Sequence, residues 1–387
     1  MIVLMNDGIA ADDPRVRAVC AKARFHRVVP TVHKEQGTHY GVVEVYFKDT
    51  PEQRCSAVPN YPFQSMQGVK EVIRVSPAQV SLRSNGGQRE PRRIQIGSDQ
   101  IGQGLPCVPV FGPCTVDRHV DAILRGLKEN GIKHVRGGGR KPRSNAKGFR
   151  GFGSKGWRWL MQAAKEYSME SVWTEVMESQ DVDTVRAIRD EIKFPGDLVL
   201  WVGARNTGSY RLLERLGACR DVVAMIKNGL YEHDVDALFT RAEFVVSGPM
   251  YWDEDGVLDE KRSRESGNDQ LILCVRGLEN RDPHSRLRFY PNYEWIAAIH
   301  ERSWAPVCFD PSHIAGDSER VFPVLHEALE YCPDVVMVEV HSDPAKALCD
   351  KDQAVRMEDV PRLLSMIRMG NERRQPERLL AQNEAAG

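Results

Sequence analysis

The pattern of apolar and polar positions changes partway along the chain. The first part contains an apolar run at 2–5, a helix-like stretch at 13–25 and the alternation of a half-buried strand at 40–47. A further strand-like piece lies at 72–75. Strands interleaved with a helix over so short a segment predict a small α+β domain at 1–85.

The pattern then becomes a steady alternation of short apolar strands and amphipathic helices. A preceding segment rich in Gly, Ser, Arg and Gln predicts a linker at 86–104. Strands that are apolar on both faces, each followed by a helix, predict a parallel sheet, and eight of them favour a closed (β/α)8 barrel at 105–370. An open doubly wound sheet is the alternative, and 371–387 is expected to be a polar tail. The predicted strands are 108–111, 134–136, 172–175, 198–202, 222–226, 271–274, 307–309 and 335–340, with helices at 120–129, 156–167, 210–216, 319–331 and 360–369 among them.

Length, composition and charge narrow the class of protein. The 387 residues suit a barrel of about 250 residues with a smaller domain. The 53 basic and 54 acidic side chains nearly cancel, so no overall field favours nucleic acid or an acidic membrane, and any anion site must be local. No apolar run spans a membrane, no secretory signal is visible, and nine scattered cysteines without a CxxC pair suit reduced thiols. We therefore expect a cytoplasmic protein with neither a membrane nor a nucleic acid as partner.

Cationic side chains gather where the predicted strands end. In a (β/α)8 barrel the active site lies at the carboxyl ends of the strands. The second, fourth, fifth and sixth strands all run into Lys or Arg there, which predicts a ring of cations around one cavity. Such a ring repels itself unless anions fill it, and arginine matches the oxygens of phosphate and carboxylate. We expect a ligand that carries both groups. The cations are Arg136, Lys141, Arg143, Arg205, Lys227 and Arg276.

A second group of reactive residues lies at the mouths of the first, seventh and eighth strands, which adjoin when a barrel closes. These are Cys114, His313 and Glu339, and Asp350 follows the last strand. A thiolate, an imidazole and two carboxylates suit Mn, Fe(II), Co or Zn better than Mg or Ca. Such a divalent metal could polarise a carbonyl as a Lewis acid. Taken singly, the cysteine could be a buried small residue and Asp350 a helix or turn cap.

The segments that carry these residues resemble those of DAHP (3-deoxy-D-arabino-heptulosonate 7-phosphate) synthases and, more widely, the superfamily that includes KDO8P (3-deoxy-D-manno-octulosonate 8-phosphate) synthases. The resemblance is collinear over about 105–355, and the N-terminal segment resembles the ferredoxin-like domain of one subclass. It implies a TIM barrel behind a ferredoxin-like α+β domain. The matching segments are GPCTVD at 112–117, RGGGRKPRS at 136–144, TEVMES at 174–179, VGARN at 202–206, IKNG at 226–229, LILCVRG at 271–277, DPSH at 310–313 and VEVHSDPAKALCDKDQ at 338–353.

The activity implied by the resemblance is a metal-dependent, aldol-type condensation of phosphoenolpyruvate with erythrose 4-phosphate, which is the first step of the shikimate pathway. Lys141 is the implied proton donor to the developing alkoxide, and a metal-bound water is the alternative. The resemblance also implies a homo-oligomer, either tetramer or dimer, and an aromatic amino acid as effector of 1–85. Residue by residue, it makes Cys114, His313, Glu339 and Asp350 the metal ligands, assigns Ala204, Arg205 and Lys227 to phosphoenolpyruvate and its phosphate, assigns Arg136, Lys141 and Arg276 to its carboxylate end, and places Arg143 and Ser144 at the acceptor's phosphate.

Some positions depart from the family's pattern. Arg140 stands in place of an aromatic residue, Arg150 in place of Gln and Val275 in place of Glu, and the segment 249–268 is longer than usual. Such changes keep open a synthase for another aldose phosphate, although the Pro142-Arg143 pair favours the four-carbon acceptor. The alternatives from other classes are a regulatory barrel without turnover and, more remotely, a nucleic-acid-binding module.

Overall fold

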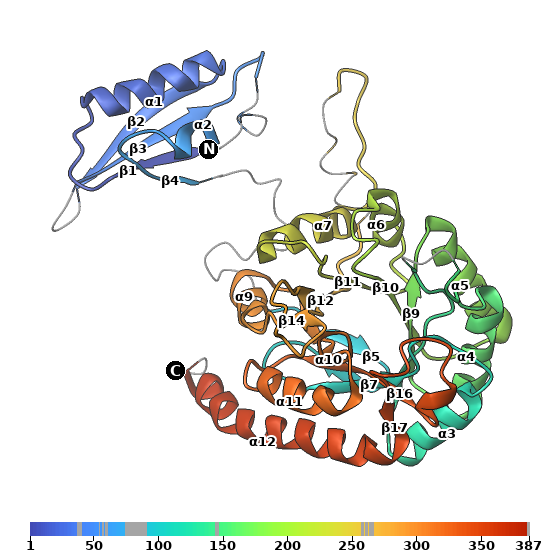
Figure 1. Ribbon diagram of the computed structural model, residues 1–387. Helices are drawn as coiled ribbons and strands as arrows, with labels where there is room; N and C mark the ends of the chain where they lie inside the picture. The colour runs from blue at the N-terminus through green and yellow to red at the C-terminus, as the bar shows by residue number, and fades with distance from the viewer. Residues whose placement is uncertain are drawn as a thin grey trace. The chain divides into compact units, whose positions relative to one another are not determined.

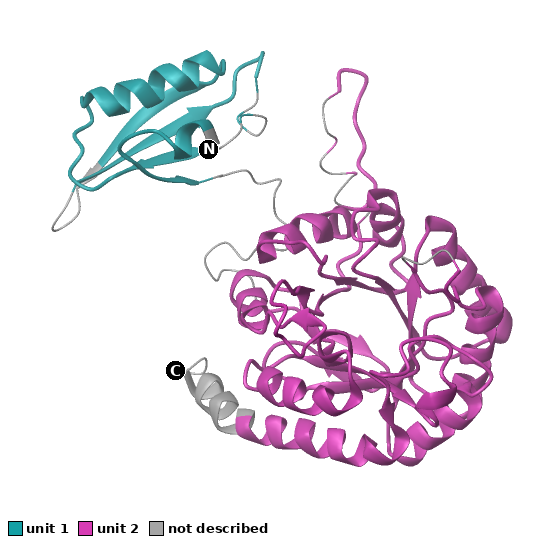
Figure 2. Cartoon of the chain, viewed as in Figure 1, with its two compact units in different colours: residues 1–80 teal, residues 81–387 magenta. Residues whose placement is uncertain are grey.

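The structure, a computed structural model, divides the chain into two compact units, Met1–Val80 and Ser81–Gly387 (Figure 2). It describes residues 1–36, 41–53, 55, 58, 61–73, 91–143, 147–256, 259, 262 and 267–384. Ser144, part of the long segment 249–268 and the first part of the predicted linker therefore lie outside the described residues. Among the residues described, no helix is both long enough and apolar enough to cross a membrane.

The first unit has a ferredoxin-like fold, as predicted. Its strands and helices follow the order β-α-β-β-α-β, and the antiparallel sheet has the strand order β2-β3-β1-β4. The first helix begins at Pro14, because the side chain of Asp13 accepts a hydrogen bond from the backbone N–H of Arg15 and proline suits the first helical position. The elements are β1 (Ile2–Met5), α1 (Pro14–Phe25), β2 (Val29–Gln36), β3 (Gly41–Lys48), α2 (Tyr61–Gln64) and β4 (Val69–Ile73).

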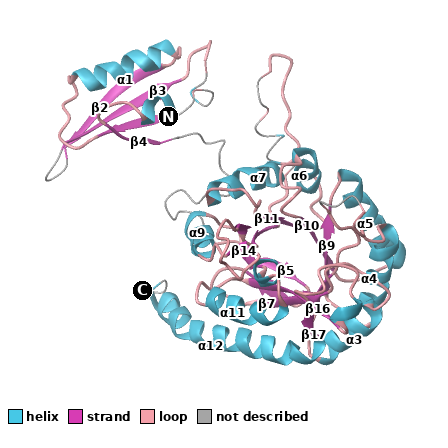
Figure 3. Cartoon of the chain, viewed as in Figure 1, coloured by secondary structure: helices cyan, strands magenta, loops and turns pink. Residues whose placement is uncertain are grey.

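The second unit is a closed barrel of eight parallel strands surrounded by helices (Figures 1 and 3). Each barrel strand pairs with the next along the chain, and the eighth strand pairs with the first, from Val335 opposite Val108 to Glu339 opposite Gly112. This closure confirms the predicted barrel and excludes the open sheet. The barrel strands are β7 (Val108–Gly112), β8 (His134–Arg136), β9 (Ser171–Val176), β10 (Asp197–Val202), β11 (Val223–Lys227), β12 (Leu271–Val275), β15 (Val307–Phe309) and β16 (Val335–His341).

Helices connect the barrel strands and cover the outside of the sheet. The last helix, α12, runs to Glu384, so most of the segment that the sequence predicted as a separate polar tail continues this helix. The helices are α3 (Val120–Glu129), α4 (Ser154–Glu166), α5 (Ser179–Ile192), α6 (Tyr210–Gly217), α7 (Val235–Ser247), α9 (Glu294–Arg302), α10 (Pro311–Ala315), α11 (Ser318–Leu329) and α12 (Val360–Glu384). The smaller elements are the hairpin β13 (Leu278–Glu279) and β14 (Phe289–Tyr290), the strand β17 (Val355–Arg356) beside β16, and the 3-10 turns η2 (Pro344–Lys346) and η3 (Met357–Asp359).

Alternate residues of each barrel strand enter two different cores. In β10, Leu198 and Leu200 pack in the outer core under the helices, whereas Val199 and Trp201 pack inside the barrel. This alternation follows from the period of two in a strand. It also determines which residue of each strand points into the mouth of the barrel.

A short hairpin packs into the inner core of the barrel. It consists of β5 (Ile94–Ile96) and β6 (Asp99–Ile101), whose isoleucines share this core with Trp173 and Trp201 of the barrel strands. The prediction of a linker at 86–104 is therefore wrong for residues 94–101. Their two strands are only three residues long, and it is the tertiary contact of the isoleucines that stabilises them.

Replacing Gly112 at the end of β7 with alanine is expected to destabilise the barrel by about 3 kcal/mol or more. A Cβ at this position would lie 2.1 Å from the backbone oxygen of Arg136, and the φ of +155° is one that side-chain-bearing residues rarely adopt. The measurement is the midpoint of denaturant unfolding. Gly208→Ala is the control, because a Cβ there meets no atom within 4 Å, and its effect should stay within about 0.5 kcal/mol. Equal midpoints for the two variants would contradict the close packing of β7 against β8.

Candidate active site and metal centre

Side chains of a strand alternate between its two faces, so each barrel strand has one inward-pointing position at or just after its carboxyl end. In every barrel strand this position holds a polar residue or a glycine. Trp173 points into the barrel, and so does Glu175 two residues later; Met225 and Lys227 repeat this relation on β11. The same step predicts the inward position of each remaining strand. Together these positions make a ring of two glycines, three cations and three carboxylates, all at one end of the barrel: Gly112, Arg136, Glu175, Gly203, Lys227, Arg276, Asp310 and Glu339.

This ring surrounds a polar pocket that collects most of the predicted substrate-binding residues. Pro142 and Leu230 add apolar contacts, and Trp201 forms part of its wall. Arg205 is exposed at its edge, while Arg136, Lys141 and Lys227 are buried. The sequence had predicted this gathering of cations. The complete lining is Arg136, Lys141, Pro142, Glu175, Trp201, Gly203, Ala204, Arg205, Lys227, Leu230, Arg276 and His313.

Two of the buried cations, Lys227 and Arg136, are held in place by buried carboxylates and by the side chain of Trp201. The Nζ of Lys227 lies 2.5 Å from Oδ2 of Asp310, and NH2 of Arg136 lies 3.1 Å from Oε1 of Glu339. Both cations also lie over the ring of Trp201, at 5.1 Å and 5.2 Å from its centroid. Cation–π contacts and ion pairs offset some of the cost of burying these charges.

Arg276 is less well paired than the other two buried cations. It stacks on Phe289, and burial lowers its pKa to about 10, although the charge of Asp310 opposes this shift. Its buried NH1 atom has no hydrogen-bond partner among the described residues. Buried guanidinium nitrogens are normally satisfied, so this one offers a place for an anionic oxygen within the pocket.

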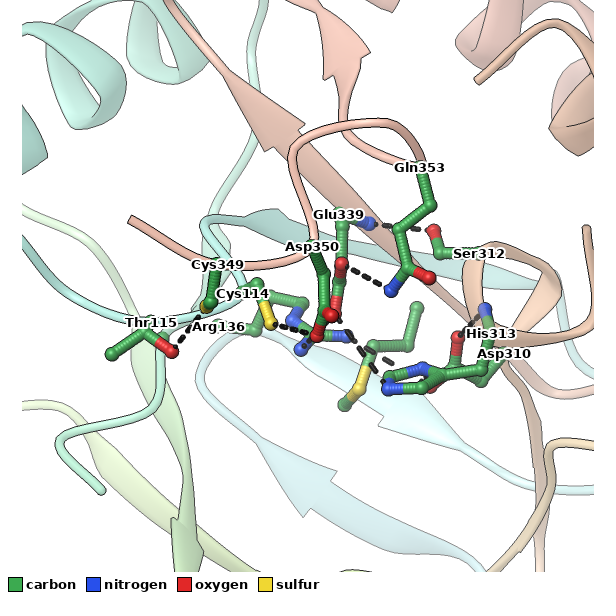
Figure 4. A network of polar contacts seen from close by, with 12 residues as sticks. Cys114, Thr115, Arg136, Asp310, Ser312, His313, Glu339, Cys349, Asp350 and Gln353 are labelled. Atoms are coloured by element: carbon green, nitrogen blue, oxygen red, sulfur yellow. Dashed lines mark hydrogen bonds and ion pairs between the residues drawn. The ribbon is translucent and has the colours of Figure 1, made fainter. Parts of the chain in front are cut away.

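Beside the pocket, Cys114 and Asp350 form a close group with Lys141 (Figure 4 shows the two candidate ligands). The Sγ of Cys114 lies 3.2 Å from Oδ2 of Asp350, and the Nζ of Lys141 lies 2.8 Å from each of these atoms. Burial raises the pKa of the Cys114 thiol, helped by Cys349 and Glu339. The positive charge of Lys141 keeps the pKa of Asp350 well below its usual range in spite of burial. Asp350 also has a φ of +45°, which aspartate tolerates better than most residues.

His313 and Glu339 form the other half of the candidate metal centre. The Nε2 of His313 lies 3.8 Å from Oε1 of Glu339. Burial lowers the pKa of His313 to about 4, against the opposing charge of Asp310, so the imidazole is neutral at neutral pH. Its Nδ1 lies 2.8 Å from Oδ2 of Asp310. Because a carboxylate can only accept, Nδ1 carries the proton, and the lone pair of Nε2 is free to bind a cation.

Neighbouring side chains fix the orientation of Glu339. The amide nitrogen of Gln353 donates to its Oε2 at 2.6 Å, and its backbone N–H donates to Oγ of Ser312 at 2.9 Å. The charge of Arg136 is the main influence that lowers the pKa of Glu339 against the effect of burial. Partners of this kind orient metal-binding side chains in known centres.

Glu175 was not among the residues that sequence reasoning selected. It lines the pocket, and burial raises its pKa, whereas the charges of Lys141, Lys227 and Arg136 act in the opposite direction. Gly203 makes room for it, since a Cβ at that position would lie 2.0 Å from its Oε1. The alternation along β9 could have revealed this inward carboxyl group.

Three departures from the family's pattern, Arg140, Arg150 and Val275, are not among the residues that line the pocket. Arg140 pairs with Asp181 of α5, with its Nε 3.0 Å from Oδ1. Val275 is buried in the outer core under the helices. Arg150 contributes its backbone oxygen, which accepts from the backbone N–H of Lys141 at 2.9 Å. Arg143, a predicted acceptor contact, points NH1 toward Asp350 at 3.6 Å.

Asp310→Asn is expected to weaken binding of a divalent metal by roughly 10- to 100-fold, because this carboxylate holds the proton on Nδ1 of His313. The amide would also leave Lys227 without its 2.5 Å charge partner. The measurement is a metal titration by calorimetry. Asp117→Asn is the matched control, since Asp117 is a buried carboxylate that pairs with His341 at 3.4 Å outside the pocket lining. Equal metal affinities in the two variants would argue against the role given to Asp310.

Comparisons with known proteins agree on one group of enzymes. The profile described as the DAHP synthetase I family matches residues 86–374. The phospho-2-dehydro-3-deoxyheptonate aldolase of Thermotoga maritima is 28% identical over 360 residues, which are 92% of this chain and 94% of the relative. The 2-dehydro-3-deoxyphosphooctonate aldolase of Geotalea uraniireducens is 26% identical over 72% of this chain and 97% of its own length.

Solved structures give the same result. The crystal structure of the DAHP synthase from Thermotoga maritima superposes with a TM-score of 0.69 at 25% identity, covering 97% of this chain and 98% of that one. A truncated form of the synthase from the same organism gives a TM-score of 0.57 at 27% identity, over 78% of this chain and 96% of that chain.

Proposed function

Because the chain belongs to the DAHP synthetase I family, we propose that it condenses phosphoenolpyruvate with erythrose 4-phosphate to give 3-deoxy-D-arabino-heptulosonate 7-phosphate and inorganic phosphate, the first step of the shikimate pathway. The family assignment makes the chain a carbon–carbon bond-forming synthase. The observation that carries the proposal is the buried cation ring directly beside a thiol, an imidazole and two carboxylates.

Phosphoenolpyruvate is proposed to fill the cation ring. Its phosphate would lie against Arg205 and Lys227, beside Ala204, and its carboxylate end against Arg136, Lys141 and Arg276. The unpartnered NH1 of Arg276 supports this assignment, because a carboxylate or phosphate oxygen would satisfy it. A fixed ring of this kind stabilises negative charge without reorganising during the reaction.

A divalent metal ion, Mn, Fe(II), Co or Zn, is proposed to bind Cys114, His313, Glu339 and Asp350. The donor set suits a borderline-soft ion. Two further observations support the fit: Lys141 places a positive charge 2.8 Å from both Cys114 and Asp350, and the lone pair of His313 Nε2 faces Glu339. When bound, the ion would supply a Lewis acid that polarises the aldehyde of the acceptor.

The chain's own residues would position the substrates and move the protons. As C3 of phosphoenolpyruvate forms the new bond to the aldehyde carbon, the aldehyde oxygen becomes an alkoxide and takes a proton from Nζ of Lys141. Water adds at C2, and Glu175 in the pocket wall is proposed to accept its proton. The bond between C2 and the phosphate oxygen then breaks, the C2 hydroxyl passes its proton to the departing phosphate, and a ketone is left while hydrogen phosphate is released beside Arg205 and Lys227.

The acceptor is tested by a direct comparison of aldose phosphates. The metal-reconstituted protein is incubated with phosphoenolpyruvate and erythrose 4-phosphate, arabinose 5-phosphate or no acceptor, and loss of the enol absorbance is followed. Faster loss with erythrose 4-phosphate supports the proposal. A preference for arabinose 5-phosphate would instead favour the second candidate, an activity like that named for the octonate-type relatives.

Residues 1–85 are proposed to regulate the barrel by binding an aromatic amino acid, within a homo-oligomer that is either a tetramer or a dimer. The separate core of the first unit, built around Val3, Val45 and Phe63, supports a domain that can bind a ligand by itself. Inhibition of the full-length protein by tyrosine, phenylalanine and tryptophan, each tested alone, is the measurement.

A further inference from the structure

A second cysteine lies at the candidate metal centre. The Sγ of Cys349, the Sγ of Cys114 and a carboxylate oxygen of Asp350 all lie within 4.8 Å of one another. Cys349 directly precedes Asp350 in the loop after β16, and Figure 4 shows it on the side of Cys114 away from His313. A sequence search based on strand ends misses this residue, because it lies in a loop.

The position of the second sulfur is well defined by its surroundings. The side chain of Cys349 is buried, with 7% of the residue exposed, and its Sγ lies 2.7 Å from Oγ1 of Thr115. Thr115 follows Cys114 and also bridges to Gly138 of the neighbouring loop. The two sulfurs are therefore presented by adjoining, buried segments.

We propose that Cys349 is an additional thiolate ligand of the divalent metal and that it makes the centre select zinc-like, thiophilic ions over manganese. The inference rests on the proposed function, because it concerns the same ion. Zinc–sulfur bonds are about 2.3 Å long, so two sulfurs that share an ion lie up to about 4.6 Å apart. In the structure the two sulfurs lie within 4.8 Å of one another, a range that includes the separations at which two sulfurs share one ion.

Positive charge at the centre favours anionic ligands such as thiolates. Arg136 pairs with Glu339, and Lys141 and Arg143 pair with Asp350, with Nζ of Lys141 also 2.8 Å from Sγ of Cys114. A cation beside a thiolate stabilises its charge. Thiolate ligands also favour zinc, whereas manganese prefers oxygen ligands.

The number of thiolates on the metal can be read from the cobalt-loaded protein. Each cobalt–thiolate bond contributes charge-transfer absorption in the near ultraviolet, so we expect Cys349→Ser to lose about half of the wild-type intensity per bound cobalt, as Cys114→Ser does. The preference for zinc over manganese in a competition assay should fall by roughly 10- to 100-fold. Cys219→Ser is the matched control, because Cys219 is a buried thiol of the outer core, and its spectrum should equal that of the wild type.

X-ray absorption on the zinc-loaded wild-type protein tests the inference without a substitution. Two sulfur neighbours of zinc are expected. One sulfur neighbour, or an unchanged cobalt spectrum in Cys349→Ser, would overturn the role of Cys349. Consumption of phosphoenolpyruvate with erythrose 4-phosphate by the same wild-type preparation distinguishes the two proposals. If the protein consumes phosphoenolpyruvate but zinc has one sulfur neighbour, only the inference about Cys349 is wrong. If zinc has two sulfur neighbours but no phosphoenolpyruvate is consumed, only the proposed function is wrong.

Discussion

Replacing Cys114 with alanine is expected to reduce the consumption of phosphoenolpyruvate by roughly 10²- to 10⁴-fold. Its sulfur lies 3.2 Å from Asp350 and 2.8 Å from Lys141, at the junction between the candidate metal centre and the cation ring. A Lewis acid contributes several kcal/mol to a reaction that develops negative charge, and each 1.4 kcal/mol corresponds to about tenfold in rate. The rate is measured from the enol absorbance at saturating metal, together with the metal content of the purified variant.

The matched control for this experiment is Cys219→Ala, which removes a buried thiol from the outer core and is expected to keep the wild-type rate. Far-ultraviolet circular dichroism of both variants separates loss of the site from loss of the fold. A Cys114→Ala protein that keeps both the metal and the wild-type rate would contradict its role as a ligand.

Replacing Lys141 with methionine is expected to reduce turnover by roughly 10²- to 10⁴-fold, the usual contribution of a general acid. Methionine keeps an unbranched apolar side chain, one atom shorter than that of lysine, and removes the charge beside Cys114 and Asp350. Lys165→Met is the control, because Lys165 donates to the backbone oxygen of Ile192 and does not line the pocket. Single-turnover rates are the measurement, and a Lys141→Met rate equal to that of the control would remove the lysine from the mechanism.

The pH dependence of the wild-type rate gives a second test of Lys141. Burial acts to lower the pKa of Lys141, but the negative charges around it, among them the carboxylates of Glu339 and Asp350, outweigh burial and raise this pKa well above its ordinary value. A group with a raised pKa keeps its proton until the pH passes that pKa, so the ammonium form is present throughout the neutral range. We therefore expect no loss of rate from this group below about pH 10. A fall at about pH 8–9 that disappears in Lys141→Arg would contradict this assignment.

The barrel could be predicted from the sequence because its strands are continuous apolar runs. The prediction of 198–202, for example, differs by one residue from the observed β10, Asp197–Val202. The hairpin at residues 94–101 was mistaken for a linker, because its apolar residues are few and their packing against Trp173 and Trp201 is a tertiary contact. Local patterns do not contain that information.

The candidate site could be predicted in part for a similar reason. Cations and potential metal ligands at strand ends are visible as residue types, and the structure brings Cys114, His313, Glu339 and Asp350 into one network. Whether they bind a metal stays a prediction. Glu175 was missed because it lies within an apolar strand, and Cys349 because its approach to Cys114 depends on the path of a loop.

The most direct test of the proposed condensation is to identify the product that the metal-reconstituted protein forms from phosphoenolpyruvate and erythrose 4-phosphate. Mass spectrometry of the product is combined with an assay for free phosphate, with and without a chelator. We expect a seven-carbon 3-deoxy sugar acid that retains one phosphate, one phosphate released for each phosphoenolpyruvate consumed, and no reaction with the chelator present. Metal-loaded protein that binds phosphoenolpyruvate but forms no such product would contradict the proposal.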